Sequence, residues 1–315
     1  MLKIGKITAF LVVLLTIVVN SKLSFAQQDP LYTQYMDNLL VINPGYAGTK
    51  GIGNVLFVAR SQWVSFDGAP ATRSLAYNTP VENKNVGFGL SLLSDQIGPM
   101  KQTGFYADYS YHLQLSQNFK LGLGLKGGVS FYRANLSDLI TIDPNDPILD
   151  NDIYENFLPN VGVGFFLFSD KTYFGLSVPR LIENKITRES VSTEYVNKQQ
   201  LHLYFVGGHQ FDLNDDFQLK TSGMFKWVRN APVSFDVTGL FGFKEKFWIG
   251  AMYRFDAAYG VLTQFKPTPA LTIGYSYDIT ITELNGYQNG SHEIMLSYDF
   301  SLFGGRSSAS STDER

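Results

Sequence analysis

The side chains of this chain that could carry out chemistry are few and scattered. The four histidines are His112, His202, His209 and His292. His292 is followed by Glu293, but the second histidine that completes the zinc-protease motif is absent. We therefore interpret the histidines as lumen or interface residues whose ring nitrogens are satisfied by neighbouring groups.

The stretch 143–155 offers the strongest pattern for a metal, because it concentrates five carboxylates. Carboxylate oxygens are ligands for Ca²⁺, but the regular spacing and the glycine of an EF-hand loop are missing. A solvated acidic loop is therefore the preferred interpretation. We expect no metal site and no cofactor, and keep as weak candidates Asp143, Asp146, Asp150 and Asp152.

Other catalytic patterns are absent as well. The chain has no cysteine, which excludes disulfides, thiol catalysis and thiolate metal sites. No Gly-x-Ser-x-Gly elbow and no Ser/His/Asp order stands out. The formal net charge of −3 argues against nucleic acid, which needs a concentrated basic surface. We predict that the protein is not an enzyme.

Residues 1–26 have the pattern of a cleaved secretory signal peptide. Lys3 and Lys6 precede an apolar run over 7–19, and Ser24 and Ala26 are the small residues of a cleavage site after Ala26. The alternative is a membrane anchor, but the run is shorter than the ~20 residues that a bilayer core requires. No cysteine follows the cleavage site, so a lipoprotein is not expected.

A two-residue alternation dominates the rest of the chain. In 119–131 (FKLGLGLKGGVSF), Leu121, Leu123 and Leu125 share one face, while Gly122 and Lys126 share the other. Successive side chains of a strand point to opposite sides, so this pattern predicts a strand with one apolar and one polar face.

Some fourteen segments repeat this pattern, an even number that is typical of bacterial outer-membrane barrels. We therefore predict an all-β fold, a transmembrane antiparallel β-barrel over 53–303 with lipid outside and water inside. The predicted strands are 53–63, 69–79, 85–94, 101–115, 118–133, 157–168, 172–178, 200–211, 216–228, 232–243, 246–256, 259–266, 269–279 and 291–303.

The polar face of each predicted strand should line the lumen. A charge on the lipid face costs about 2–4 kcal/mol at mid-depth. We therefore expect lumenal positions for Asp108, Lys126, Lys226, Asp236 and Arg254. Gly-x-Gly pairs at 87–89, 122–124 and 162–164 lie within strands and open no helix, so they are not phosphate loops. Such glycines instead leave room for something inside the barrel.

The lengths of the connections orient the predicted barrel. Connections after even-numbered strands are all tight, and every long connection follows an odd-numbered strand, as at 134–156, 179–199 and 280–290. Outer-membrane barrels have short periplasmic turns and long extracellular loops. We therefore expect both termini in the periplasm and the long loops outside, with a disordered tail over 304–315.

The N-terminal segment 27–52 is too apolar and aromatic for a free periplasmic tail. It either plugs the lumen, covers the mouth of the barrel or binds a periplasmic partner. In the last case the candidate binding residues are Tyr32, Tyr35, Asn43, Pro44 and Tyr46.

Four sequence blocks give the chain a family resemblance. They are 28–36 (QDPLYTQYM), 41–48 (VINPGYAG), 60–73 (RSQWVSFDGAPATR) and 292–298 (HEIMLSY). In order and position they resemble the PorP/SprF family of type IX secretion membrane proteins, from the first mature residues to the last strand. The departures are small: 37–40 (DNLL) and Gly45 differ from the usual family pattern.

The resemblance implies an outer-membrane barrel of a type IX secretion and gliding system. Members of the family serve the secretion and motor apparatus through periplasmic or lipoprotein partners, or hold one secreted adhesin at the cell surface through its C-terminal sorting domain. For cargo contact we favour the loops 64–70, 134–156, 179–199 and 280–290. In the first of these, an exposed aromatic pair beside a turn fixed by proline suits a binding hot spot, formed by Trp63, Phe66, Asp67 and Pro70.

Two alternatives remain open from the residues alone. Trp63 also fits an aromatic girdle at the membrane interface, with its loop capping the barrel. The whole protein also fits a passive channel or a transporter of hydrophobic solutes, in which the N-terminal segment is a movable hatch.

Overall fold

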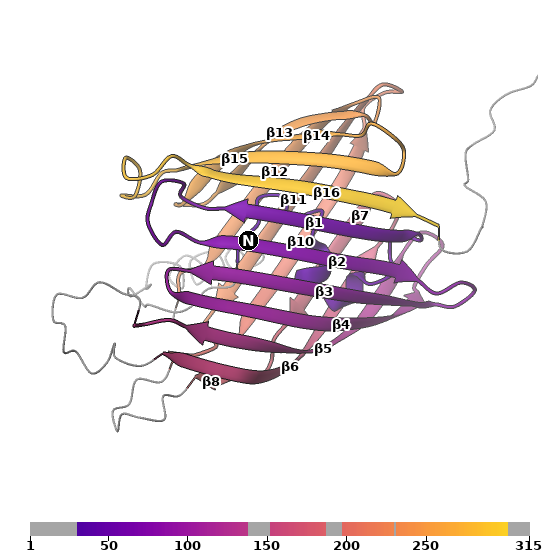
Figure 1. Ribbon diagram of the computed structural model, residues 1–315. Helices are drawn as coiled ribbons and strands as arrows, with labels where there is room; N and C mark the ends of the chain where they lie inside the picture. The colour runs from indigo at the N-terminus through magenta and orange to yellow at the C-terminus, as the bar shows by residue number, and fades with distance from the viewer. Residues whose placement is uncertain (1–29, 138–151, 187–196, 230, 302–315) are drawn as a thin grey trace, which may run out of the picture.

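The protein is a closed antiparallel β-barrel of fourteen strands (Figure 1). The computed structural model describes residues 30–137, 152–186, 197–229 and 231–301. The predicted barrel and its strand number are confirmed. The barrel strands are β1 (Gly53–Ser61), β2 (Ala71–Pro80), β3 (Val86–Ile97), β4 (Met100–Gln114), β5 (Lys120–Ala134), β6 (Ile153–Phe168), β7 (Thr172–Val178), β10 (His202–Asp212), β11 (Phe217–Val228), β12 (Ser234–Phe243), β13 (Phe247–Arg254), β14 (Ala258–Phe265), β15 (Leu271–Thr280) and β16 (Ser291–Phe300).

Each barrel strand pairs with the strands that precede and follow it in the barrel, and β1 closes the barrel by pairing with β16. Strand β7 pairs with β10, because β8 (Lys185–Ile186) and β9 (Asn197–Lys198) form a separate two-stranded ribbon in the connection between them. The sequence predicted 179–199 only as a long connection, without strands. Strands of two residues are too short to show an alternation, so this ribbon left no signal.

The alternation of side chains separates lipid from lumen as predicted. Outward positions carry exposed apolar residues such as Phe88, Leu125 and Ile249, whereas the charged residues expected in the lumen are all buried. Apolar side chains on the outward face suit contact with lipid. Four of the five inward charges form two ion pairs, Lys126 with Asp108 and Arg254 with Asp236.

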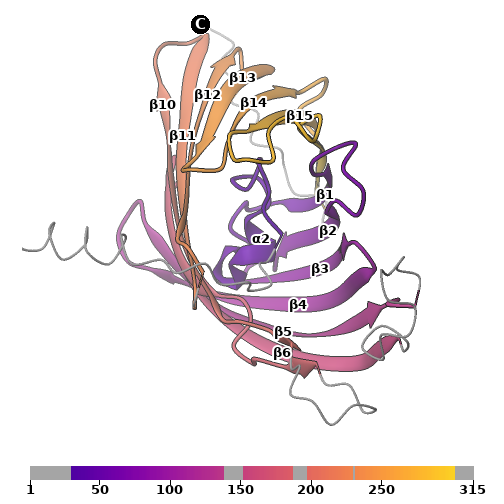
Figure 2. The same cartoon turned by 90° about the vertical axis from the view of Figure 1, so that its left-hand side faces the viewer.

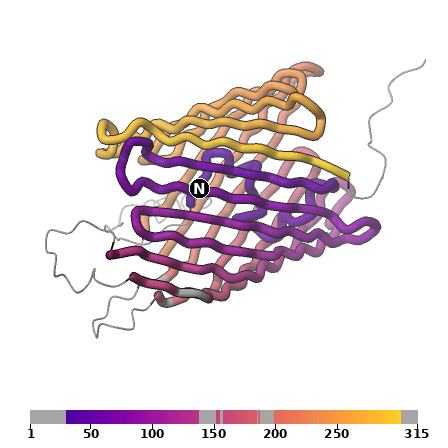
Figure 3. Tube along the Cα trace, in the orientation of Figure 1, coloured from indigo at the N-terminus to yellow at the C-terminus, as the bar shows by residue number. Residues whose placement is uncertain are grey.

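The two ends of the barrel differ in the length of their connections (Figures 1 and 3). Strand β1 begins and β16 ends at the end that carries short connections, which we call the short-turn end. The opposite end, the long-loop end, carries the connections 62–70, 135–152, 179–201 and 281–290. The asymmetry predicted from the sequence is therefore present in the fold.

The core of the molecule lies inside the barrel, around the N-terminal segment 30–52 (Figure 2). This segment contains the short helix α2 (Leu39–Ile42) and the 3₁₀ turn η1 (Pro44–Tyr46). Its side chains pack against inward residues of the strands, such as Val58, Val206 and Met295. The described part of the segment, which we call the plug, therefore lies inside the lumen. Among the described residues, no helix has both the length and the apolar character to cross a membrane.

The first and last residues of the described segment lie at opposite ends of the barrel. Pro30 borders a pocket with Ile97 and Met100, which flank the β3–β4 turn at the long-loop end. Lys50 pairs with Asp299 (3.1 Å) next to the end of β16, at the short-turn end. The two ends of the described segment therefore lie at opposite ends of the barrel, while the chain termini, which we expect in the periplasm, lie outside the described residues. Connection lengths fix where the first strand starts, but they carry no information on the path of the residues before it.

Candidate interaction site

A row of glycines lets the backbone of the N-terminal segment lie directly on the barrel wall. A Cβ atom on Gly124 would lie 2.1 Å from the Gly45 nitrogen, and one on Gly122 would lie 2.2 Å from the Gly45 oxygen. A Cβ atom on Gly87 would lie 2.2 Å from the Ala47 oxygen. Any larger residue at these positions would displace the segment. The prediction that lumenal glycines make room for something inside the barrel is confirmed.

Polar groups of the wall satisfy the backbone of the segment in the lumen. Ser177 Oγ donates to the Ile42 carbonyl (2.7 Å), and Ser110 Oγ donates to the Gly45 carbonyl (3.0 Å). The Gly48 N–H donates to Asn78 Oδ1 (2.6 Å). A buried backbone group without a partner is costly, so these contacts hold the segment in one register along the wall.

An ion cluster of Arg60, Asp278 and Glu293 binds the first part of the segment. Glu293 accepts the backbone N–H groups of Thr33 (2.9 Å) and Gln34 (2.8 Å). Arg60 bridges Glu293 (3.4 Å) and Asp278 (2.7 Å), and the side chains of all three are at most 3% exposed. Glu293 of β16 thus binds two adjacent peptide groups of the segment, while Arg60 of β1 and Asp278 of β15 contact the Thr33 hydroxyl. Charged partners make such hydrogen bonds stronger than neutral ones.

The five residues of the segment that the sequence analysis proposed for partner binding lie in the lumen. Tyr35 donates to Ser222 (3.2 Å), and Asn43 bonds to the Phe165 carbonyl (3.1 Å) and to the Gly45 N–H (2.9 Å). Tyr46 packs edge-on against Phe166. Tyr32, Tyr35, Asn43 and Pro44 are buried, and Tyr46 is half-buried. Their contacts hold the plug in place, and binding of a partner by them stays a prediction.

The loop 62–70 is the second part of the site, and hydrogen bonds fasten it to its neighbours at the long-loop end. The Val64 N–H donates to the Gly290 carbonyl (2.8 Å), and the Asn289 N–H donates to the Val64 carbonyl (2.7 Å). On its other side, the Gly98 N–H donates to the Gly68 carbonyl (2.9 Å). This pairing joins the β1–β2 loop to the β15–β16 loop and to the β3–β4 turn, so its shape is fixed by the barrel.

The backbone of this loop is strained where it turns. Trp63 (φ 47°) and Ser65 (φ 73°) adopt left-handed conformations without being glycines. Such residues cost on the order of 1–3 kcal/mol each and tend to occur at functional sites. In this loop Phe66 is 42% exposed and Asp67 is exposed, while Trp63 and Pro70 are half-buried. The loop therefore presents an aromatic side chain on a rigid support.

One of the four weak metal candidates in the acidic stretch, Asp152, lies within the described residues. Asp143, Asp146 and Asp150 lie outside the described residues. Asp152 is described: its Oδ1 accepts the Ser137 N–H (3.1 Å) and hydroxyl (2.9 Å), and the backbone bond first and the hydroxyl second lower the pKa of this exposed carboxyl. Across 30–137, 152–186, 197–229 and 231–301, no group of three histidine or acidic side chains could hold a metal ion.

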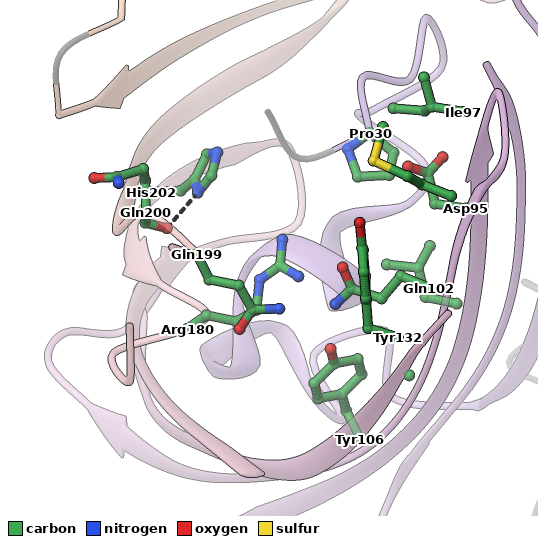
Figure 4. A pocket seen from close by; sticks show the side chains of 13 residues that line it. Pro30, Asp95, Ile97, Gln102, Tyr106, Tyr132, Arg180, Gln199, Gln200 and His202 are labelled. Carbon is green, nitrogen blue, oxygen red and sulfur yellow. Dashed lines mark hydrogen bonds between the residues drawn. The ribbon is translucent and has the colours of Figure 1, made fainter. Parts of the chain in front are cut away.

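Pockets open at both ends of the plugged lumen. At the long-loop end, a pocket of about 80 Å³ is bordered by Pro30, Tyr106, Arg180 and His202, and His202 Nδ1 bonds to the Gln200 carbonyl (3.0 Å) (Figure 4). At the short-turn end, a pocket of about 330 Å³ is lined by Tyr46 and other residues of the segment and the wall. The segment lies between the two.

Two features of the site, an ion cluster and an exposed tyrosine, were not predicted from the sequence. The cluster of Arg60, Asp278 and Glu293 joins β1, β15 and β16, and its members carried only the weak signal of charges on the polar face of predicted strands. Tyr287, 74% exposed in the loop that pairs with Val64, was part of a proposed contact loop but was not singled out. The sequence feature that could have pointed to Tyr287 is an aromatic residue within an otherwise polar loop.

Comparison with known proteins identifies one family. The model of the family "Type IX secretion system membrane protein PorP/SprF" matches residues 24–298. A search of the curated proteins gave no significant match. The solved structures that are similar include the outer membrane protein Omp33 of Acinetobacter baumannii (10% identity, TM-score 0.44, 79% of this chain and 98% of that one). Another is the CymD monoaromatic hydrocarbon channel (9% identity, TM-score 0.45, 82% of this chain and 91% of that one). The likeness to both is distant.

Proposed function

Because this chain belongs to the PorP/SprF family of type IX secretion system membrane proteins, we propose that it is a non-enzymatic, non-conducting anchor of that system in the outer membrane. It assists the secretion of an adhesin-like protein and holds that protein at the cell surface through its C-terminal sorting domain, or it links the barrel to periplasmic secretion and motor partners. In this proposal the long loops face outward and Phe300 faces the periplasm.

The observation that carries the proposal is the filled lumen. The N-terminal segment lies against wall glycines at Gly45 and Ala47, and an ion cluster holds it at Thr33 and Gln34. A segment held at so many points is a structural part of the barrel, and solute flow would require all of these contacts to break. A barrel that conducts no solute can still serve as a rigid platform whose two ends are open to contact with partners.

The loop 62–70 supports binding at the long-loop end. Hot spots of protein interfaces are enriched in aromatic residues on surfaces that need little rearrangement. Phe66 and Tyr287 are exposed aromatics on two loops that are hydrogen-bonded to each other. We assign the cargo contact to this pair of loops, with Trp63, Asp67 and Pro70 shaping the turn.

Co-purification from membranes tests the proposal. We expect the tagged full-length barrel to retain a large secreted protein with a type IX sorting domain, and a strain without the barrel to lose that protein from its surface. Secretion and surface display that continue unchanged without the barrel would refute the proposal. The alternative, a channel with a movable hatch, predicts steady conductance of the full-length protein in planar bilayers.

A further inference from the structure

We infer that the N-terminal segment is threaded lengthwise through the barrel in the membrane, so that its two ends face opposite compartments. Pro30 is then reachable only from the side of the long loops, and Lys50 only from the side of the short turns. The inference concerns the topology of the chain and does not depend on the cargo-anchoring role.

The position of Pro30 is defined by residues at two connections of the long-loop end, the β3–β4 turn and the β7–β10 connection. It shares a pocket with Ile97 and Met100 at the β3–β4 turn, with Arg180 after β7, and with Gln199 before β10. The close-up view shows Pro30 across this pocket from Arg180 and His202 (Figure 4). Three residues later, Thr33 meets Asp278 and Glu293, which lie at the long-loop ends of β15 and β16.

The position of Lys50 is defined at the opposite end. Its Nζ lies 3.1 Å from the Asp299 carboxylate, one residue before β16 ends. Two residues earlier, Gly48 packs on Gly87 near the start of β3, at the short-turn end. From Gly53 the chain continues directly into β1.

The contacts between these ends follow the barrel axis in order. Tyr35 reaches Ser222 and Asn38 reaches Ser74, both in the middle of their strands. Gly45 then meets Gly122 and Gly124 close to the short-turn end of β5. A barrel presents an apolar band ~25 Å tall. About twenty residues at 1.5 to 3.3 Å each exceed that height, so the segment is long enough to cross it.

One consequence follows from the threading. Pro30 lies beside connections of the long-loop end, so the N-terminal end of the described segment contributes to the partner-facing surface there.

Accessibility of single cysteines tests the inference, since the natural chain contains none. Pro30→Cys, Leu31→Cys and Lys50→Cys are introduced separately into the full-length protein. Asp67→Cys marks the long-loop end and Asp215→Cys marks the short-turn end, because both residues are exposed. Intact and permeabilised cells are treated with a membrane-impermeant maleimide, and labelling is divided by that of the denatured protein. Heat-modifiable migration in gels confirms that each variant is folded.

We expect Pro30→Cys or Leu31→Cys to be labelled under the same condition as Asp67→Cys. Lys50→Cys should be labelled under the same condition as Asp215→Cys, and the two conditions should differ. This test does not depend on which end of the barrel faces outward. In a reversed barrel each cysteine would be labelled under the opposite condition, but Pro30→Cys would still match Asp67→Cys and Lys50→Cys would still match Asp215→Cys. Labelling of all segment positions from one side would overturn the inference. Folded variants in which neither Pro30→Cys nor Leu31→Cys reacts in permeabilised cells would overturn it as well.

Discussion

At the scale of single residues, the glycines of β5 distinguish the face that carries the plug from the face that meets lipid. A Cβ atom on Gly124 would lie 2.1 Å from the Gly45 nitrogen. We expect Gly124→Ala to lower the free energy of unfolding by about 1–3 kcal/mol, the usual cost of overpacking. Urea unfolding of the protein in lipid vesicles, followed by tryptophan fluorescence, measures this change.

Gly127 supplies the matched control, because it lies three residues away in the same strand and a Cβ atom there would meet nothing within 4 Å. Gly127→Ala should leave the stability within about 0.5 kcal/mol of the natural protein or raise it slightly. Equal losses in the two variants would show that Gly124 matters for the strand rather than for the plug.

The ion cluster of Arg60 gives a second prediction at this scale. Arg60→Met leaves the carboxylates of Asp278 and Glu293 buried without their shared cation. Removing one partner of a buried ion pair costs about 3–5 kcal/mol. The exposed pair Lys244–Asp216 (3.8 Å) is the control, and Lys244→Met should cost about 0–1 kcal/mol in the same unfolding experiment. Similar losses of unfolding free energy in both variants would contradict the role of the ion cluster in holding the plug.

At the scale of elements, local patterns in the sequence predict the wall of the barrel but not its contents. The alternation in 119–131 defines β5 and its faces, because the two-residue period is a property of each strand alone. The glycine pairs even indicate that something lies inside. The path of the segment from Pro30 to Lys50 depends on contacts between residues more than 200 positions apart, such as Thr33 with Glu293, and no local pattern encodes them.

The N-terminal segment is also the element whose removal should change the behaviour of the barrel most. Deleting residues 30–50 should empty the lumen of the fourteen-stranded barrel. We expect the deletion variant to form open pores in planar bilayers and the full-length protein to stay silent. Sustained conductance of the full-length protein at the level of the deletion variant would support the hatch model instead.

At the scale of the whole molecule, we propose that the barrel is a platform whose long-loop end binds the partner. Phe66→Ala removes an exposed aromatic side chain from a loop that the barrel holds rigid. Loss of a hot-spot residue costs about 2 kcal/mol or more, which is roughly a 30-fold loss of affinity. The amount of secreted partner that co-purifies with the tagged barrel measures the effect. Leu213→Ala is the control, because Leu213 is 53% exposed at the short-turn end, and it should leave co-purification unchanged.

We propose that this barrel anchors a secreted partner, and the amount of that partner on the cell surface tests this role. Proteins with a type IX sorting domain are released from intact cells by protease and quantified by mass spectrometry. The strain that lacks the barrel is compared with strains complemented by the natural chain and by Phe66→Ala. We predict that one such protein is missing from the surface of the strain that lacks the barrel. Its amount should be restored by the natural chain and only partly restored by Phe66→Ala. An unchanged set of surface proteins in all strains would contradict it.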